Sequence, residues 1–432
     1  MPRFLLAALL VGAAAFLAAP APGHRILQLP AGVVEVRSEM VVGGLTEVRG
    51  ARSGTVLRAA PGFAGRAIIV ARGDGVRLRD FTVDGNRDAL EVRAGLPPYD
   101  TPFARFTRGN GVLADGIAGV RVENVRFRNV AGFAVLASRS RDVAIDRVRV
   151  ESSGSRNAAG RNNATGGILL EEGTTDFRVT RCELRDIRGN GVWTHSLYTS
   201  PRNARGLFAH NRFENIGRDA IQVGHATDVR VEDNQGERIG YPVEDVDLEG
   251  RAIPVAIDTA GNVERSSYAR NRFAGVNGKC MDLDGFHDGE IRGNVCRDLG
   301  NYGIVMNNSN PDMQSRNIRV EENLIDGALF GGIFVIGTGH TVARNRLLNL
   351  NRAHCNEEAA RSGCYYAPGE PDMLRSGIYL GKGAERPAPA RGNVIEDNEI
   401  TGFRMDTRCI AAAPGIAPSW NTIRANKCRT AP

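Results

Sequence analysis

A four-residue pattern of small and apolar positions recurs along this chain from about residue 110 to the C-terminus. In each copy, a glycine or another small residue is followed by apolar, variable and mostly apolar positions. This period of two is typical of a β-strand with one buried and one outward face. The nine copies are Gly111–Ala114, Gly167–Leu170, Gly191–Thr194, Ala220–Val223, Ala256–Thr259, Cys280–Leu283, Gly303–Met306, Gly332–Val335 and Gly377–Leu380. Each copy predicts a short strand.

A second pattern, Asn-x-apolar, accompanies the first. Its copies begin at Asn211, Asn271, Asn294, Asn323, Asn345, Asn398 and Asn426, and uninterrupted neighbours lie 22 or 23 residues apart. One such repeat cannot bury its own apolar face, whereas coils stacked about 4.8 Å apart pair their strands and share a core. The asparagines are expected to stack from coil to coil through their amides, which is a structural role.

The repeated strand, the coil length and the asparagine column resemble right-handed β-helix proteins of the pectin-lyase-like superfamily over about residues 28 to 430. The segment Gly75–Asn86 resembles an early coil of these proteins. The resemblance implies an all-β, single-stranded right-handed parallel β-helix with long loops flanking one sheet. The superfamily includes polysaccharide lyases, glycoside hydrolases, mannuronan epimerases and phage tailspikes, so the resemblance implies glycan handling without selecting a reaction.

The N-terminus has the features of a signal peptide. Arg3 precedes an apolar run from Phe4 to Ala19, which Pro20 and Pro22 end. We therefore predict a signal peptide over residues 1–23 and the β-helix domain over 24–432. No second apolar stretch approaches a membrane span, so we expect a secreted or periplasmic protein without membrane contact after cleavage. By analogy with other elongated solenoids, we expect a monomer.

The seven cysteines receive different predictions in an oxidising compartment. Cys355 and Cys364 lie nine residues apart in a polar insertion and predict a disulfide. Cys182, Cys296 and Cys428 occupy positions of repeat strands, where we expect buried thiols. Cys280 and Cys409 remain unassigned, and no cysteine spacing is typical of a zinc or redox site.

The net charge of +6 comes almost entirely from arginine, since Lys279, Lys382 and Lys427 are the only lysines. An arginine-rich surface favours polyanions such as uronate-rich glycans. A coding bias toward arginine explains the charge equally well. Nucleic acid is not an expected partner, because the chain has no zinc finger, RNP-like strand or basic helix.

Aligning the strands places outward side chains in two adjacent columns. The variable position gives Leu113, Leu169, Trp193, Gln222, Asp258, Asp282, Val305, Phe334 and Tyr379; the residue after each strand pattern gives Asp115, Glu171, His195, Gly224, Ala260, Asp284, Asn307, Ile336 and Gly381. Carboxylates gather in two neighbouring coils, which makes Asp258, Asp282 and Asp284 the candidate catalytic residues. The candidate substrate-binding residues around them are Trp193, His195, Gln222, His225, Asn307, Asn308, Tyr379 and Lys382.

Stacking would place Asp258 and Asp282 roughly 5 Å apart, with Asp284 about 7 Å along the strand. Like charges this close are unfavourable unless something offsets them. One carboxyl could hold its proton, the three aspartates could bind a divalent cation such as calcium, or arginines could pair with them. The first two outcomes are chemistry, and the third is a structural ion-pair network.

Insertions on both sides of this strand support a trough for an extended sugar chain. They occupy residues 151–165, 236–252 and 350–376 before the strand, and residues 196–205, 308–316 and 382–391 after it. Trp193 and Tyr379 could stack on sugar rings or cover apolar surface.

Two mechanisms fit an enzyme. In hydrolysis, one aspartic acid protonates the glycosidic oxygen while another attacks or activates water. In elimination from a uronate, calcium holds the substrate carboxylate while a base removes a ring proton; Lys279, His195, His225 and His287 are candidate bases. Gly285–Asp288 loosely resembles the Asp-Pro-His-acid motif of mannuronan epimerases, without its proline, and this resemblance implies proton transfer by His287. A histidine in a surface turn is the structural alternative.

A non-catalytic glycan-binding or adhesin-like surface is the alternative from another class. It predicts arginine partners for all three aspartates, whereas an enzyme predicts a strained acid or a metal at the same place.

Overall fold

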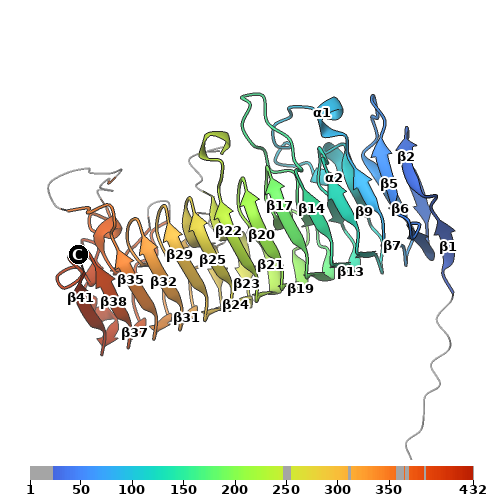
Figure 1. Cartoon of the computed structure of the whole chain (residues 1–432). Coiled ribbons are helices and arrows are strands. Elements are labelled where there is room, and N and C mark those ends of the chain that lie inside the picture. The colour runs from blue at the N-terminus through green and yellow to red at the C-terminus, as the bar shows by residue number, and fades with distance from the viewer. Residues whose placement is uncertain are drawn as a thin grey trace, which may run out of the picture.

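A computed structural model describes residues 23–246, 254–309, 313–356, 364, 369–383 and 386–431. The chain winds into a right-handed parallel β-helix, and its successive coils run from one end of the molecule to the other (Figure 1). Residues 1–22 of the predicted signal peptide lie outside the described residues. The expected fold class is confirmed.

Three faces surround the core, and every pairing between named strands is parallel. The first face consists of β3 (Met40–Gly43), β6 (Ala67–Arg72), β9 (Asn110–Asp115), β12 (Val135–Ser138), β15 (Ile168–Glu171), β18 (Val192–His195), β21 (Ile221–Glu232), β23 (Val255–Glu264), β26 (Lys279–Asp284), β30 (Ile304–Asn307), β33 (Ile333–Val335), β36 (Ile378–Leu380) and β39 (Ile410–Ala412).

The second face joins the first because β21 runs through both, and β27 lies at the corner between them. It consists of β1 (Arg25–Gln28), β4 (Thr46–Arg49), β7 (Arg77–Arg79), β10 (Arg121–Glu123), β13 (Arg141–Asp146), β16 (Thr175–Thr180), β19 (Asn203–Ala209), β24 (Ser267–Ala269), β27 (Phe286–His287), β28 (Glu290–Arg292), β31 (Arg319–Glu321), β34 (Thr341–Ala343), β37 (Val394–Glu396) and β40 (Thr422–Arg424).

The third face is a separate sheet of 14 strands. It consists of β2 (Gly32–Val36), β5 (Thr55–Ala59), β8 (Thr82–Asp84), β11 (Arg126–Arg128), β14 (Arg149–Glu151), β17 (Glu183–Ile187), β20 (Arg212–Ile216), β22 (Gln235–Ile239), β25 (Arg272–Val276), β29 (Val295–Leu299), β32 (Leu324–Ala328), β35 (Arg346–Leu350), β38 (Glu399–Gly402) and β41 (Lys427–Thr430).

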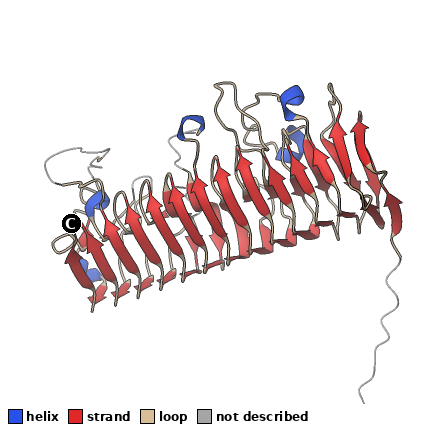
Figure 2. Ribbon diagram, in the orientation of Figure 1, coloured by secondary structure: helices blue, strands red, loops and turns tan. Residues whose placement is uncertain are grey.

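Helices are confined to the loops (Figure 2). They are α1 (Arg87–Leu90), α2 (Phe103–Phe106), and the 3-10 turns η1 (Val243–Asp245), η3 (Met373–Arg375) and η4 (Pro418–Trp420). Within the described ranges, no helix has the length and apolar character needed to cross a bilayer. Of the predicted insertions, residues 247–252, 310–312, 357–363, 365–368 and 384–385 lie outside the description.

The predicted asparagine column is confirmed at the corner between the second and third faces. The Nδ2 atom of each asparagine donates to the Oδ1 atom of the next at 2.9–3.0 Å. The column consists of Asn211, Asn234, Asn271, Asn294, Asn323, Asn345, Asn398 and Asn426, of which the sequence pattern missed Asn234. Each side chain therefore links two coils and also satisfies buried backbone groups of the turn.

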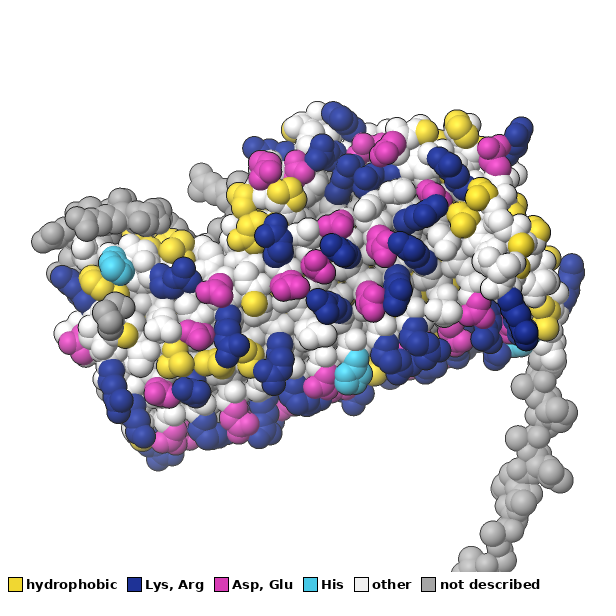
Figure 3. Space-filling view, in the orientation of Figure 1, with side chains coloured by type: hydrophobic (Ala, Val, Ile, Leu, Met, Phe, Trp, Pro, Cys, Tyr) yellow, Lys and Arg dark blue, Asp and Glu magenta, His cyan; other side chains and the backbone are white. Residues whose placement is uncertain are grey.

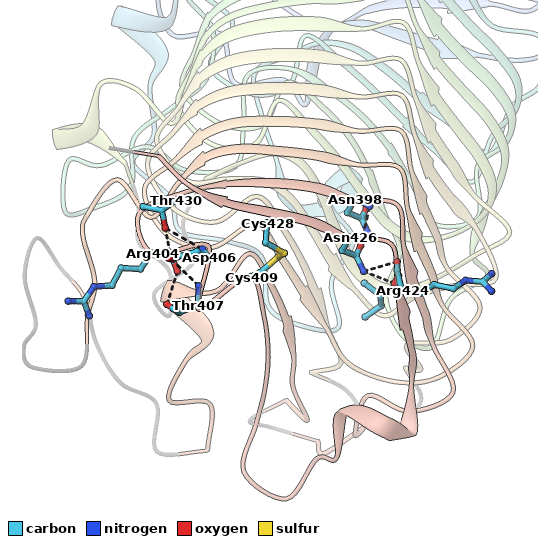
Figure 4. Close-up of a disulfide and its surroundings, with 10 residues drawn as sticks. Asn398, Arg404, Asp406, Thr407, Cys409, Arg424, Asn426, Cys428 and Thr430 are labelled. Atoms are coloured by element: carbon cyan, nitrogen blue, oxygen red, sulfur yellow. Dashed lines mark hydrogen bonds between the residues drawn. A yellow bond between two sulfur atoms is a disulfide. The ribbon is translucent and has the colours of Figure 1, made fainter.

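Disulfides connect cysteines whose side chains meet across the core. The predicted Cys355–Cys364 disulfide is confirmed, and Cys182 is a buried thiol as expected. The prediction of thiols was wrong for Cys296, which bonds to Cys280, and for Cys428, which bonds to Cys409. Figure 4 shows the Cys409–Cys428 bond. The Cys280–Cys296 bond joins β26 to β29, and the Cys409–Cys428 bond joins the residue before β39 to β41. Strand alternation alone does not reveal these proximities. Three disulfides are typical of a protein that folds in an oxidising compartment.

Arginine and acidic side chains are interspersed on the face that carries the third sheet (Figure 3). On this sheet, Arg149 pairs with Glu183 and Arg346 pairs with Glu399, each across adjacent coils. Arginines on this sheet thus form ion pairs with acidic side chains of neighbouring coils.

Candidate functional site

The outward column of the first face is apolar at both ends of the β-helix and polar between them. Strand pairing places Leu113, Leu136, Leu169, Trp193, Gln222, Asp258, Asp282, Val305, Phe334 and Tyr379 in one continuous register. The predicted column is therefore confirmed, and it contains one further coil, at Leu136, that is not among the nine predicted copies. Apolar residues occupy both ends of the column, and a polar window of Gln222, Asp258 and Asp282 separates them.

The N-terminal part of the column is covered by the loop that carries α2. Phe103 packs against Trp193 with 5.0 Å between ring centroids, and both belong to a second apolar cluster outside the main core. Trp193 is only 8% exposed. It stabilises the covering loop in this conformation, and the expectation of an exposed sugar platform at Trp193 was wrong.

The C-terminal part of the column is also covered. Tyr379 is fully buried, 6.0 Å from the Phe334 ring, so the expected sugar stacking on Tyr379 was wrong. Lys382, another predicted binding residue, lies where the chain leaves β36, and Glu370 accepts a hydrogen bond from its backbone nitrogen at 2.8 Å. Buried Glu370 thereby ties the segment before η3 to the end of the first face.

A chain of side-chain hydrogen bonds crosses the polar window. Asn190 donates from Nδ2 to Gln222 Oε1 at 2.7 Å, and Gln222 donates from Nε2 to Asp258 Oδ2 at 2.8 Å. Asp282 follows Asp258 in the strand register and forms an ion pair with Lys279, three residues earlier on β26. The other carboxylate oxygen of Asp282 is buried and accepts no hydrogen bond from the residues described.

Asp219 is a third carboxylate at the window. It directly precedes the coil of Gln222, is 8% exposed, and accepts a hydrogen bond from the Val255 backbone nitrogen at 2.6 Å. Asp219 and Asn190 lie before the bend, outside the two outward columns, so the strand pattern does not single them out. Comparing the residue before each small strand-entry residue places Asn190, Asp219 and Lys279 in a third column.

Burial and mutual repulsion shift the acid equilibria of this group. Burial, followed by the charges of Asp219 and Asp282, raises the pKa of Asp258 well above its ordinary value. Burial also raises the pKa of Asp219, to about 6. Asp258 is therefore stabilised in its protonated form, whereas Asp282 is paired with the Lys279 ammonium group. Such a pair of unlike carboxyls can supply a proton donor and an anion at one place.

Other predicted residues have local partners. Asp284 accepts hydrogen bonds from the backbone nitrogen and the hydroxyl of Ser309, and Asn307 accepts one from the Asn308 nitrogen. His225 is buried against the Tyr198 ring at 4.1 Å, and burial lowers its pKa to about 4. The structure thus brings Asp258 and Asp282 together and orients Asp284 toward a neighbouring loop.

His287 lies at the corner after β26. Its Nδ1 atom is 2.8 Å from Asp288 Oδ2, and its Nε2 atom is 2.8 Å from Asn262 Oδ1. Asp288 also pairs with Arg316, which lowers the pKa of Asp288. His287 is buried and belongs to β27, so the alternative of a histidine in a surface turn was wrong, and proton transfer by His287 stays a prediction.

The three aspartates proposed to bind calcium do not form a compact ligand set in the described structure. Within those residues, the one group of three ligand-type side chains with all ligand atoms within 4.8 Å is Glu171, Glu172 and His195. Calcium at Asp258, Asp282 and Asp284 remains an untested prediction.

The fold and the sequence together define the class of this protein. The profile described as a right-handed β-helix region matches residues 66–241 and 157–347, which together span more than half of the chain. The chain therefore belongs to this family of right-handed β-helix proteins. No curated protein matches the sequence.

Solved structures with the same fold differ widely in function. The catalytic domain of a GH87 α-1,3-glucanase is 14% identical with a TM-score of 0.50, over 92% of this chain and 64% of that one. PfbA, a surface adhesin of Streptococcus pneumoniae, is 13% identical with a TM-score of 0.54, over 74% and 83%. Gene product 12 of bacteriophage phi29 is 12% identical with a TM-score of 0.62, over 88% and 49%. These likenesses show the fold alone, and the chain spans less than two thirds of the glucanase domain.

Proposed function

We propose that this protein is an exported enzyme that hydrolyses a glycosidic bond of a polysaccharide at the polar window. The observation that carries the proposal is the pairing of Asp258 and Asp282 on adjacent strands, where Asp282 is ion-paired with Lys279 and Asp258 accepts its hydrogen bond from the Gln222 amide. Asp258 has a raised pKa and a single amide donor, and Asp282 is ion-paired with Lys279. Glycoside hydrolysis requires two carboxyls in these two states.

Each side chain has a role in this reaction. Asp258 donates its proton to the glycosidic oxygen as the bond to the sugar breaks. Asp282 acts on the anomeric carbon, either directly or through a water that it deprotonates. Gln222, held by Asn190, fixes the orientation of the Asp258 carboxyl so that its proton faces the window. Asp219 acts through charge, because its anion favours the protonated form of Asp258.

The non-catalytic alternative predicts arginine partners for the aspartates. In the described part of the chain, neither Asp258 nor Asp282 forms an ion pair with an arginine, although such pairs between coils are frequent elsewhere on this molecule. A buried acid with one hydrogen bond destabilises the fold. This placement supports a catalytic role over an inert surface.

The test incubates the purified mature chain with neutral glucans, pectin and alginate, each with and without a chelator. We expect new reducing ends without the ultraviolet absorbance of an unsaturated uronate, and we expect the chelator to leave the rate unchanged. Asp258→Asn and Asp282→Asn should each lower kcat at least 100-fold, consistent with the size of general-acid and nucleophile contributions.

Asp176→Asn is the matched control, because Asp176 is an exposed second-face aspartate that pairs with Arg205. It should keep full activity. Unsaturated products that require calcium would instead identify elimination. Turnover unchanged in both window variants, or glycan binding without any turnover, would refute the hydrolase.

A further inference from the structure

We propose that Glu171, Glu172 and His195 bind a divalent transition-metal ion of the zinc type on the first face, separately from the polar window. Glu171 ends β15, Glu172 follows it, and His195 pairs with Glu171 in the register of β18. One potential ligand atom from each side chain lies within 4.8 Å of the other two. Side chains whose ligand atoms lie this close together are able to hold one metal ion.

The imidazole of His195 gives independent support for a ligand. Its Nδ1 atom is buried and has no hydrogen-bond partner in the described structure. Its ring is fixed between Phe103 and Trp193, at centroid distances of 5.4 and 5.2 Å. The fully buried Ser138, next to Glu171 in the register, has a hydroxyl that makes no hydrogen bond of normal geometry. Buried polar atoms without partners are rare and require an explanation.

Both carboxylates are already oriented by the protein. Glu171 accepts hydrogen bonds from the backbone nitrogens of Phe103 and Ala104 at 2.9 and 2.8 Å. Glu172 accepts one from the Leu197 nitrogen at 2.9 Å and one from the Ser200 hydroxyl. Each carboxylate oxygen keeps a second lone pair for a metal. Hydrogen bonds of this kind fix the orientation of metal ligands in proteins.

The protonation states fit this ligand set. Burial lowers the pKa of His195 to about 4, so its imidazole is neutral at physiological pH, as a metal ligand must be. Burial, with a smaller contribution from the Glu172 charge, raises the pKa of Glu171 to about 7. A bound cation offsets the repulsion between the adjacent carboxylates and shifts Glu171 to its ionised form.

The donor atoms select the type of ion. Calcium prefers six to eight oxygen ligands, whereas one imidazole with two carboxylates is a ligand set that zinc binds, with a fourth position left for water. The ion would join two loops to the first face, since Glu171 holds the start of α2 and Glu172 holds residues 197–200. The metal would thereby order the covering loop beside the polar window.

The experiment uses the full mature chain after dialysis against EDTA. Zn²⁺ is added, with Mn²⁺ and Ca²⁺ in parallel, and the bound metal is measured by mass spectrometry after gel filtration. We expect about one Zn²⁺ per chain, a higher thermal midpoint with Zn²⁺, and no comparable rise with Ca²⁺. His195→Gln and Glu172→Gln should weaken Zn²⁺ binding by more than about 100-fold, beyond the 10- to 100-fold effect of losing an outer partner.

Two control variants separate this site from its neighbours. Glu183→Gln removes an exposed third-face carboxylate and should leave Zn²⁺ binding unchanged. Asp282→Asn should also leave it unchanged, and a loss there would instead place the ion in the polar window. Sub-stoichiometric Zn²⁺ in the parent chain, or equal affinity in both ligand variants, would overturn the proposal.

A measurement on the unmodified chain does not depend on how the variants fold. Diethyl pyrocarbonate modifies accessible imidazole nitrogens, and peptide mass mapping reports each histidine separately. Bound Zn²⁺ should protect His195 at least tenfold while His210, an exposed histidine, reacts at the same rate. Equal modification of His195 with and without Zn²⁺ would contradict metal coordination.

Discussion

Glu171→Gln should remove the pH dependence that one buried carboxyl imposes on stability. In the metal-free protein, the pKa of Glu171 rises from 4.5 to about 7 because of burial. Between these values the folded chain holds a proton that the unfolded chain has released. The contribution of Glu171 is therefore fully present below pH 4.5 and is lost as the pH rises through 7. A difference of about 2.5 units corresponds to about 3 kcal/mol.

Glutamine keeps the shape of the side chain and one of the two oxygens that accept hydrogen bonds from the Phe103 and Ala104 nitrogens. Loss of the other oxygen as an acceptor lowers the free energy of unfolding by about 1 kcal/mol. We therefore expect the variant to match the parent within about 1 kcal/mol at pH 4.5 and to exceed it by about 2 kcal/mol at pH 8. Urea unfolding in EDTA, followed by far-ultraviolet circular dichroism at pH 4.5, 6 and 8, measures this difference.

The test compares the free energy of unfolding of the parent with that of the variant at each pH, because three histidines add a pH dependence of the opposite sign. These are His195, His225 and His340, whose pKa values are lowered in the folded chain. They destabilise the fold as the pH falls from 6.5 toward 4, in both proteins alike. Glu183→Gln is the control, and its difference from the parent in the free energy of unfolding should stay constant from pH 4.5 to 8. A parent-to-variant difference that is flat within about 0.5 kcal/mol from pH 4.5 to 8 would refute the assigned burial of Glu171.

Three further predictions test other parts of the molecule. Asp219→Asn should move the alkaline limb of the pH profile of kcat/KM to lower pH, because Asp258 loses a neighbouring charge that raises the pKa of Asp258. An alkaline limb at the same pH in both proteins would contradict this prediction. Asn271→Ala should lower the free energy of unfolding by about 3 kcal/mol, because it leaves two buried donors of Asn234 unpaired. Asn426→Ala, at the C-terminal end of the asparagine column, should lower it by about 1 kcal/mol. Urea unfolding of both variants measures the two losses, and equal losses would contradict this prediction. Phe103→Ala should expose Trp193 and red-shift its fluorescence in a Trp420→Phe background, whereas an unchanged spectrum would refute the covering contact.

The strand register could be predicted from the sequence because its causes are local. Alternation with a period of two determines which side chains point outward, and the repeat length determines which coils are neighbours. The pairing of Asp258 with Asp282 follows from these two rules and is confirmed. The coil at Val135–Ser138 is not among the nine predicted copies, although its entry residue Ala134 is of the same type as Ala220 and Ala256.

Coverage of the first face could not be predicted from the repeats. Whether Trp193 and Tyr379 meet a sugar or another part of the chain depends on segments far away in sequence, such as Phe103 in the α2 loop. Those loops have no repeating pattern to align. The same limitation applies to the Cys280–Cys296 bond, because both side chains point inward but belong to different faces.

The contrast within one column favours function at the polar window. At Leu113, Leu136, Leu169 and Trp193 the outward positions are apolar and a loop covers them, which shows that this fold can bury its first face. Phe334 and Tyr379, further along the column, are also apolar outward positions that are buried. Asp258 and Asp282 interrupt the apolar column and Asp219 lies beside them; burial raises the pKa values of Asp219 and Asp258 and lowers stability. Since apolar residues would serve folding better at these positions, the carboxyls support the catalytic role proposed for the polar window.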